Sequence, residues 1–245
     1  AYFLLYPSAF ESFDLSGYDL ILSSSSAYAK GIIPGPKARH ICYCHTPMRF
    51  AWRTDAYVER EGFGAVTRIA LALLLSYVRL WDLSTSPRID QFIANSHEVA
   101  ARIQRYYGRE AIVIPPPVDL PPFQESPPGN YYLTGGRLIP YKRIDLAIQA
   151  CNALRLPLKI YGSGRDRAAL EALAGPTIEF VGYVTEEQRR ALFAGCRAFL
   201  FPGEEDFGIT PLEAMAAGRP VIAYAAGGAL DTIVPGLNGA FFHEH

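Results

Sequence analysis

Short apolar runs alternate with amphipathic stretches along the second half of the chain. The apolar runs lie at Tyr131–Thr134, Leu158–Tyr161, Ile178–Val181, Ala198–Phe201 and Val221–Tyr224. Helical periodicity is present in 141–154, 165–174, 185–195 and 211–217. Strands and helices that alternate at this spacing predict a parallel sheet covered by helices.

The first half repeats this pattern. Its apolar runs lie at Tyr18–Leu22, Ile41–Cys44, Gln91–Ala94 and Ala111–Ile114, and its helical stretches at 65–82 and 97–107. Both halves are therefore predicted to be α/β, with one architecture used twice.

A proline-rich segment separates the two halves. Residues 115–129, PPPVDLPPFQESPPG, contain seven prolines in fifteen positions. Because proline fixes φ and lacks an N–H donor, neither a helix nor a central strand can run through this segment. We predict two doubly wound domains, 1–117 and 130–245, that face a cleft and are joined by a stiff linker at 118–129. Ligands bind beyond the carboxyl ends of strands in such sheets, so chemistry is expected in the strand-to-helix turns.

Composition narrows the class of protein. The chain has 245 residues, is 50% hydrophobic and 19% charged, and has a formal net charge of −1. This excludes disorder and argues against a nucleic-acid partner, which would need a basic face. The four cysteines do not form a disulfide framework in a chain of this length, so free thiols in a reducing compartment are expected. No N-terminal segment has the parts of a signal peptide, and the expected location is cytoplasmic.

One stretch raises the question of membrane contact. Ile69–Val78 is uncharged and mostly aliphatic, but it has about half the length of a spanning helix. Four residues share one helical stripe: Arg68, Ala72, Ser76 and Arg79. An amphipathic or buried helix that packs on the core is the simpler interpretation. The alternative is a face that touches lipid or a lipid-linked substrate, with peripheral attachment to the inner face of a membrane.

The segment 204–218, EEDFGITPLEAMAAG, follows a predicted strand and opens a predicted helix. Thr210, Pro211 and Glu213 fit a capping box, with Thr210 at the N-cap and Pro211 at the first helical position. Glu213 would then have a structural role.

A ligand-binding interpretation of the same segment stays open. The free N–H groups of Gly208 and Ile209 at the helix start favour an anion such as a diphosphate. Glu205 and Glu213 can face one cleft and accept hydrogen bonds from sugar hydroxyls. A solvated acidic turn is the alternative.

A second segment, GGRLIPYKRID (135–145), follows the first strand of the second half. Pro140 at the first helical position would put Lys142 and Arg143 in the first turn of a helix. Cations there oppose the helix macrodipole at a cost of roughly a few tenths of a kcal/mol, which a bound anion would remove. Arg137 can clamp a phosphate through two hydrogen bonds, and Lys142 can add a point charge. A basic surface turn is the alternative.

Gly162 and Gly164 form a third strand-to-helix turn. The turn lacks the third glycine and the distant acidic residue of the dinucleotide fingerprint, so NAD is not expected.

His45 follows Ile41–Cys44 at the carboxyl end of that strand, where it would face the cleft, and a structural histidine is the alternative. Cys42 and Cys44 share one face of the strand and are expected in the core. No metal site is expected, because this C-x-C pair with a histidine lacks a fourth ligand.

Together these segments resemble the retaining family-4 glycosyltransferases, which have the two-Rossmann GT-B fold. In the second half the resemblance rests on GGRLIPYKRID (135–145), IYGSGRD (160–166), the E-x7-E element EDFGITPLE (205–213) and AMAAGRPVIA (214–223). The first half resembles bacterial mannosyltransferases of polysaccharide and O-antigen assembly. That likeness rests on FDLSGYDLILSSSSAYAKG (13–31), HICYCHTPMRFAW (40–52) and FIANSHEVAARI (92–103).

The resemblance implies a role for each matching residue. Arg137 and Lys142 match the basic pair on the donor diphosphate, and Glu213 matches the glutamate on the nucleotide ribose. Glu205 matches the glutamate on hydroxyls of the transferred sugar. His45 matches the cleft histidine near the reacting sugar carbon. The residues expected around the phosphates, the sugar and the nucleoside are Gly136, Gly162, Gly164, Val184, Phe207, Gly208, Ile209 and Thr210.

The implied reaction is transfer of a hexose, mannose from GDP-mannose, to a glycan or lipid-linked acceptor in polysaccharide assembly. Retention of configuration and no cofactor other than the donor substrate are expected. Both ends depart from the family pattern: the start lacks a glycine-rich turn, and the chain stops at FFHEH. An incomplete N-terminal domain is therefore expected. A nucleotide-sugar binding module or inactive fragment is the alternative, and a related epimerase is a weaker one.

Overall fold

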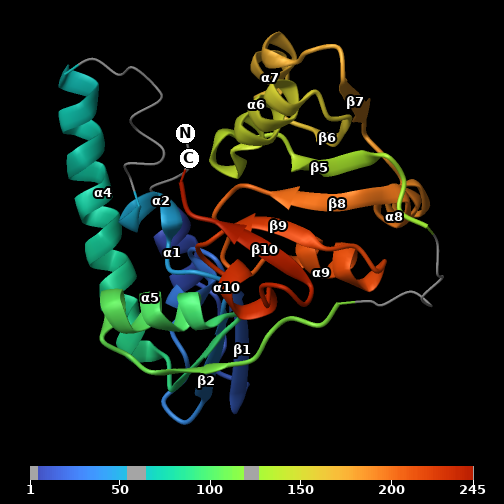
Figure 1. Cartoon of the computed structure of the whole chain (residues 1–245). Helices are drawn as coiled ribbons and strands as arrows, with labels where there is room; N and C mark the ends of the chain where they lie inside the picture. The colour runs from blue at the N-terminus through green and yellow to red at the C-terminus, as the bar shows by residue number, and fades with distance from the viewer. Residues whose placement is uncertain (1–4, 54–64, 119–126, 245) are drawn as a thin grey trace. The chain divides into compact units, whose positions relative to one another are not determined.

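The computed structural model describes residues 5–53, 65–118 and 127–244, and the chain divides into two compact units (Figure 1). Unit 1 comprises residues 1–116 and unit 2 residues 117–245. Each unit is an α/β assembly around its own parallel sheet, as predicted. Most of the predicted linker, at 119–126, lies outside the described residues.

Unit 1 contains a parallel sheet in the order β1-β2-β3-β4. The strands are β1 (Leu20–Ser25), β2 (Arg39–Cys44), β3 (Gln91–Ala94) and β4 (Ala111–Val113). The helices and 3₁₀ turns are α1 (Tyr6–Glu11), η2 (Ala29–Gly31), α2 (Arg49–Trp52), α4 (Ala65–Thr85), η3 (Ser86–Arg88) and α5 (His97–Tyr107).

One face of the unit 1 sheet carries the core. Cys42, Cys44 and Phe92 on this face are fully buried and pack against α5, which confirms the core position of the two cysteines. Because side chains alternate along a strand, Leu22 points to the opposite face and is 71% exposed.

A buried ion pair ties the helices of unit 1 together. Lys30 Nζ lies 2.8 Å from Asp82 Oδ1, and both side chains are almost completely excluded from solvent. Trp52 Nε1 and the Tyr107 hydroxyl each donate a 2.7 Å hydrogen bond to Asp82 Oδ2. The carboxylate therefore joins residues of α2, α4 and α5 in one network, and losing either charge would leave the other buried and unpaired.

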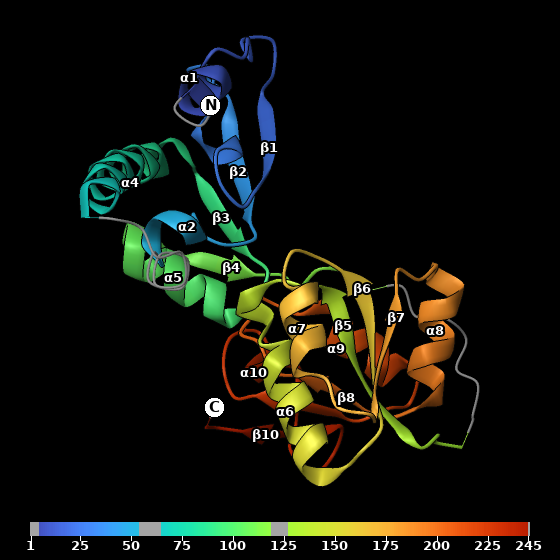
Figure 2. The ribbon, with the colours of Figure 1, turned by 90° about the horizontal axis from the view of Figure 1, so that it is seen from above.

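Unit 2 contains a parallel sheet in the order β10-β9-β8-β5-β6-β7 (Figure 2). The strands are β5 (Tyr131–Arg137), β6 (Leu158–Ser163), β7 (Ile178–Gly182), β8 (Cys196–Phe201), β9 (Val221–Tyr224) and β10 (Gly239–Phe242). The helices and the 3₁₀ turn are η4 (Pro140–Lys142), α6 (Ile144–Leu154), α7 (Arg167–Leu173), α8 (Glu186–Gly195), α9 (Ile209–Ala216) and α10 (Ala229–Thr232).

Helices cover both faces of the unit 2 sheet. Ile148 of α6 and Leu170 of α7 pack with Ile160 on one face, and Phe193 of α8 and Ala214 of α9 pack on the other. From β5 the chain first adds β6 and β7 on one side, and then returns to add β8, β9 and β10 on the other. The strand order thus reverses between β5 and β8. Beyond the carboxyl ends of these two strands lies the position where doubly wound sheets bind ligands.

Several predicted boundaries are wrong by a few residues. The helix predicted at 141–154 starts at Ile144, because Arg143 adopts a left-handed conformation with φ of 50°. The strand predicted at Tyr18–Leu22 lies at Leu20–Ser25, because Ser23 and Ser25 are buried and stay paired in the sheet. Strand β10 was not predicted.

Candidate active site

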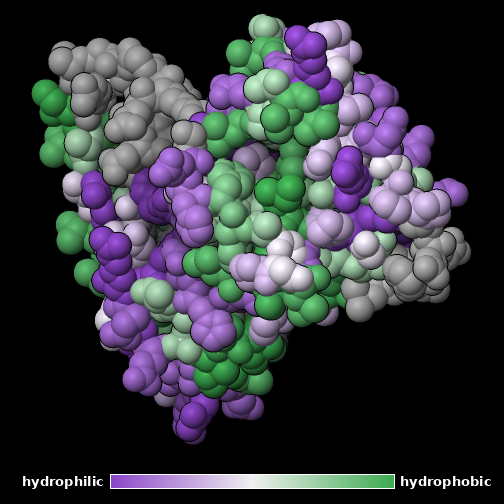
Figure 3. All heavy atoms as spheres, viewed as in Figure 1, coloured by the Kyte–Doolittle hydropathy of each residue, from purple (hydrophilic) through white to green (hydrophobic). Residues whose placement is uncertain are grey.

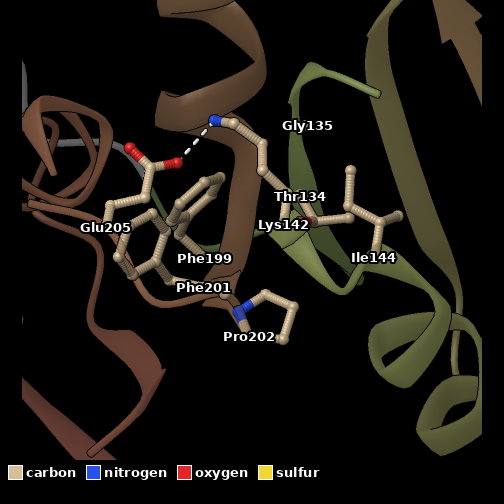
Figure 4. Close-up of a pocket in the computed structure, with 9 residues that line it drawn as sticks. Thr134, Gly135, Lys142, Ile144, Phe199, Phe201, Pro202 and Glu205 are labelled. Atoms are coloured by element: carbon tan, nitrogen blue, oxygen red, sulfur yellow. Dashed lines mark ion pairs between the residues drawn. The ribbon is translucent and has the colours of Figure 1, made fainter. Parts of the chain in front are cut away.

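An ion pair lies where the strand order of unit 2 reverses. Lys142 Nζ is 2.7 Å from Glu205 Oε1, and the two side chains are 14% and 21% exposed (Figure 4). A small pocket surrounds the pair, between the ends of β5 and β8. Its lining residues are Thr134, Gly135, Lys142, Ile144, Phe199, Phe201, Pro202, Gly203 and Glu205. The structure thus brings together the lysine predicted to bind the donor diphosphate and the glutamate predicted to bind the transferred sugar, from motifs about sixty positions apart.

Close backbone packing positions Lys142. Pro140 begins the 3₁₀ turn η4 as predicted, and Lys142 ends this turn, whereas Arg143 follows it and precedes α6. A Cβ on Gly203 would lie 2.7 Å from the Lys142 Cα, so only glycine lets the end of β8 approach this closely. The Lys142 ammonium sits over Gly136, where an added Cβ would lie 3.3 Å from Nζ.

Arg137 is the last residue of β5 and lies next to Gly136, which the Lys142 ammonium covers. Its side chain is exposed, and among the described residues no hydrogen bond or ion pair engages its guanidinium. Two cations therefore stand at the same strand end, one paired with a carboxylate and one facing solvent. This arrangement can bind a group with several negative oxygens, such as a diphosphate.

The glycine-rich turn packs against this strand end. Gly162 has φ of 105°, and a Cβ there would lie 1.9 Å from the Gly136 carbonyl oxygen. A Cβ on Gly164 would lie 2.1 Å from the Leu138 carbonyl oxygen. The space left by both missing side chains is filled by backbone of the neighbouring turn. These glycines therefore have a packing function, and their contact with a nucleoside stays a prediction.

The capping box predicted before α9 is wrong. The N-cap is Gly208, with φ of 86°, and no side chain caps the helix. Thr210 and Pro211 are consequently the second and third helical residues, and Glu213 lies further along the first turns. A glycine N-cap leaves the amides of Ile209 and Thr210 without a side-chain acceptor, and it releases Glu213 from a capping role.

The loop that carries Glu205 is held by the segment after β9. Gly228 donates its backbone N–H to the Glu205 carbonyl oxygen at 2.9 Å. A Cβ on Gly227 would lie 2.2 Å from the same oxygen, and a Cβ on Gly228 2.3 Å from the Phe207 Cα. The Phe207 side chain is buried, so only its backbone can serve a ligand in the predicted way.

Glu213 pairs with a residue that the sequence motifs missed. Its Oε1 lies 3.0 Å from Arg189 Nη2, on the neighbouring helix α8. Burial raises the pKa of Glu213, while Arg189 acts in the opposite direction. Glu213 and Glu205 both raise the pKa of the buried Tyr161 phenol, in addition to the effect of burial. The Tyr161 phenol is therefore held neutral and adds no charge to the site.

Val184 immediately precedes the capping residue Thr185 of α8 and lines a second pocket, of about 400 Å³. The residues that line it with Val184 are Tyr131, Val181, Tyr183, Gln188, Ala191 and Leu192. Its predicted role beside the nucleoside stays a prediction.

His45 belongs to unit 1. Its Nε2 lies 2.8 Å from the Ser24 hydroxyl, and its ring meets Tyr43 edge-on with centroids 5.2 Å apart. It follows β2 at the carboxyl end of that strand, where it was predicted. His40 is buried, bonds to Ser23 at 2.8 Å and has a pKa lowered by burial, which fits a structural residue.

Among the described residues, no group of three or more histidine, cysteine or acidic side chains could hold a metal ion.

Comparisons with known proteins identify the family. Residues 121–245, just over half of the chain, match the family described as "Glycosyl transferases group 1", and residues 2–121 match "Glycosyltransferase Family 4". The chain therefore belongs to the glycosyl transferases of group 1, and the resemblance to family 4 is confirmed.

Similar proteins agree with this assignment. A GDP-mannose-dependent alpha-mannosyltransferase of Mycolicibacterium smegmatis is 33% identical over 82% of this chain and 55% of its own length. The O-antigen chain mannosyltransferase C of Escherichia coli is 31% identical over 43% of this chain and 30% of its own. Sucrose-phosphate synthase from Thermosynechococcus elongatus, at 20% identity, superposes with a TM-score of 0.74 over 97% of this chain and 64% of that one. The GT-B fold class is thereby confirmed. The chain spans about half the length of the first relative.

Proposed function

We propose that this chain is part of a retaining glycosyltransferase that moves mannose from GDP-mannose to a glycan or lipid-linked acceptor in polysaccharide assembly. The proposal rests on the Lys142–Glu205 ion pair, which lies beside Arg137 where the strand order of the unit 2 sheet reverses. The chain that carries this pair belongs to a glycosyltransferase family. Mannose is supported by the names of both relatives described above, and GDP by the name of the Mycolicibacterium smegmatis relative.

The proposed chemistry begins with departure of the diphosphate. The bond between the sugar C1 and the phosphate oxygen breaks, and the acceptor oxygen bonds to C1 on the same face. The acceptor proton passes to the departing phosphate oxygen. Positive charge develops on the sugar and negative charge on the diphosphate. Arg137, Lys142 and the uncapped amides at the start of α9 would stabilise that negative charge.

The carboxylates and the histidine position the sugar and the nucleotide in this proposal. Glu205 accepts hydrogen bonds from hydroxyls of the transferred sugar, and Glu213 accepts them from the ribose. His45 lies near the reacting carbon. We do not propose the two-carboxylate scheme of glycosidases, because Glu213 would be engaged by ribose. Two cations at one strand end allow the step to proceed without a metal ion.

We further propose a cytoplasmic protein that touches the membrane surface through α4. Ile69, Leu73, Tyr77 and Leu80 are all more than half exposed, and they follow one side of the helix at three- and four-residue spacing. Figure 3 shows apolar side chains along α4, which lies at the left of the view. The stretch Ile69–Arg88 is long and apolar enough to cross a membrane, and 33% of its most apolar window is buried. Contact with the interface, rather than a crossing, fits a helix that also packs on a core through Val78 and Trp81.

The function is tested by incubating the purified protein with GDP- and UDP-sugars and an acceptor extract. Mass spectrometry would detect transfer, and NMR would assign the anomeric configuration of the product. Transfer of mannose from GDP-mannose with an α-linkage is expected. Binding of GDP without transfer would favour a binding module. Conversion of the donor to an epimer without acceptor would favour an epimerase.

A further inference from the structure

Arg189 and Glu213 form an ion pair between the helices α8 and α9. Arg189 Nη2 on α8 lies 3.0 Å from Glu213 Oε1 on α9. The side chains are 35% and 20% exposed, so the carboxylate is the more enclosed partner. The family motifs assign a role to Glu213, whereas none of the motif segments includes Arg189.

We propose that Arg189 is a positioning residue that fixes the Glu213 carboxylate, ionised, for the two ribose hydroxyls of a nucleoside diphosphate. The inference rests on the proposed ribose-binding role of Glu213. An ionised carboxylate has about four lone-pair sites and accepts only, whereas a protonated one donates and loses acceptor capacity. Arg189 engages one oxygen, and the remaining lone pairs are left for the hydroxyls.

The charges around Glu213 make Arg189 the dominant cation. Burial raises the pKa of Glu213, Arg189 lowers it, Glu186 raises it, and Arg190 lowers it to a smaller extent. Arg190 is itself paired with Glu186 on α8. Burial and Glu213 raise the pKa of the Tyr161 phenol on β6, so this group is neutral and supplies no counter-charge. Removing Arg189 would therefore leave the half-buried Glu213 carboxylate with the repulsion of Glu186 and little compensating positive charge.

A purely structural role fits the pair less well. Phe193 of α8 and Ala214 of α9 lie in the same buried cluster, with 2% and 0% exposure, and hold these helices on the sheet. Partly exposed ion pairs add little to stability. Glu213 stands in α9, the helix that follows the loop carrying Glu205, so the pair is better placed to act on a ligand than to hold the helices together.

The test compares binding of GDP and 2′,3′-dideoxy-GDP by calorimetry. The wild-type protein is expected to prefer GDP by about tenfold, the effect of losing good hydrogen bonds at a partly buried site. Arg189→Met should reduce this preference to about threefold or less. The loss of GDP affinity on acidification should also set in at a higher pH in this variant. Arg189→Lys should restore part of the preference for GDP and part of the wild-type pH dependence. The matched control is Arg190→Met, which removes the same charge one residue away and should keep the wild-type preference.

The possible outcomes separate this inference from the proposed function. An unchanged preference in Arg189→Met, or an equal loss in Arg190→Met, would overturn it. If the wild-type protein bound GDP and 2′,3′-dideoxy-GDP equally well, this result would overturn the ribose-binding role of Glu213 and with it this inference. Absence of GDP and UDP binding would overturn the donor proposal itself. If Arg189→Met does not fold, the milder Arg189→Gln gives the same comparison.

Discussion

Lys142 and Glu205, which lie in different motifs, form a 2.7 Å ion pair beyond the carboxyl ends of β5 and β8. The same ammonium is the group proposed to bind the donor diphosphate. We therefore expect a diphosphate that engages Lys142 to displace the Glu205 carboxylate from the ammonium. Exchange of one anion for another would free Glu205 for the sugar hydroxyls at the moment when the donor binds.

Glu205→Gln separates binding of the nucleotide from transfer of the sugar. Removing the competing carboxylate should raise the affinity for GDP about three- to tenfold, whereas sugar transfer should fall at least about tenfold. Glu204→Gln removes a charge one residue away and serves as the control. Calorimetry and a transfer assay measure the two effects. Weaker GDP binding by Glu205→Gln would contradict the exchange.

Chelators should not affect the reaction. Arg137, Lys142 and the amides at the start of α9 are proposed to stabilise the leaving diphosphate, so transfer in EDTA should equal transfer in magnesium. Lys142→Ala should lower the rate about a hundredfold or more, comparable to the loss of one donor at an anion site in other enzymes. A rate that collapses in EDTA and returns with a divalent cation would refute the assignment.

Binding of GDP should depend on the ionisation of Glu213. Because burial raises its pKa above the ordinary value of 4.5, Glu213 takes up a proton at a higher pH than an exposed glutamate. The protonated form accepts hydrogen bonds poorly, so GDP affinity should fall as pH is lowered through that raised pKa. Glu213→Gln should bind GDP more weakly, and its affinity should no longer fall as the pH is lowered through this range. If GDP affinity fell with pH in the same way in the wild-type protein and in Glu213→Gln, another group would be responsible for the titration.

The buried Lys30–Asp82 pair should dominate the stability of unit 1. Asp82→Asn leaves the Lys30 ammonium buried without its counter-charge and should cost about 3–5 kcal/mol. The partly exposed Arg88–Glu11 pair of the same unit provides the comparison, since Glu11→Gln should cost less than about 1 kcal/mol. Both tryptophans of the chain, Trp52 and Trp81, lie in unit 1, so their fluorescence in urea follows that unit. Similar midpoints for the two variants would contradict the prediction.

The outer side of α4 should bind lipid weakly and in a salt-sensitive way. Flotation with vesicles that contain anionic lipid should recover part of the protein, and Leu73→Glu should abolish recovery. Leu22→Glu is the control, because Leu22 is 71% exposed on a different surface of unit 1 and Leu73 is 69% exposed. Indifference of the wild-type protein to vesicles would make α4 a helix of the core alone.

The repeating elements were predictable because local chemistry decides them. The strand Gln91–Ala94 and the helix His97–Tyr107 have the predicted bounds. Ser96 caps that helix by accepting the Val99 N–H, and Gly108 closes it in the left-handed conformation. Both signals lie within a few residues of the helix ends.

The errors arose where neighbouring segments decide the conformation. Thr210-Pro211 looked like a helix start, but Gly208, with its positive φ, lets α9 begin two residues earlier. Arg189 gave no local signal, because its partner Glu213 lies on another helix. The packing role of Gly162 likewise depends on Gly136, which only the paired strands bring close.

The most direct test is a crystal structure of the protein with GDP-mannose. The account predicts the diphosphate on Arg137 and Lys142 and the ribose on Glu213. It also predicts that Glu205 has left Lys142 for the mannose hydroxyls. A donor bound elsewhere, or a bound donor with the Lys142–Glu205 pair still intact, would contradict it.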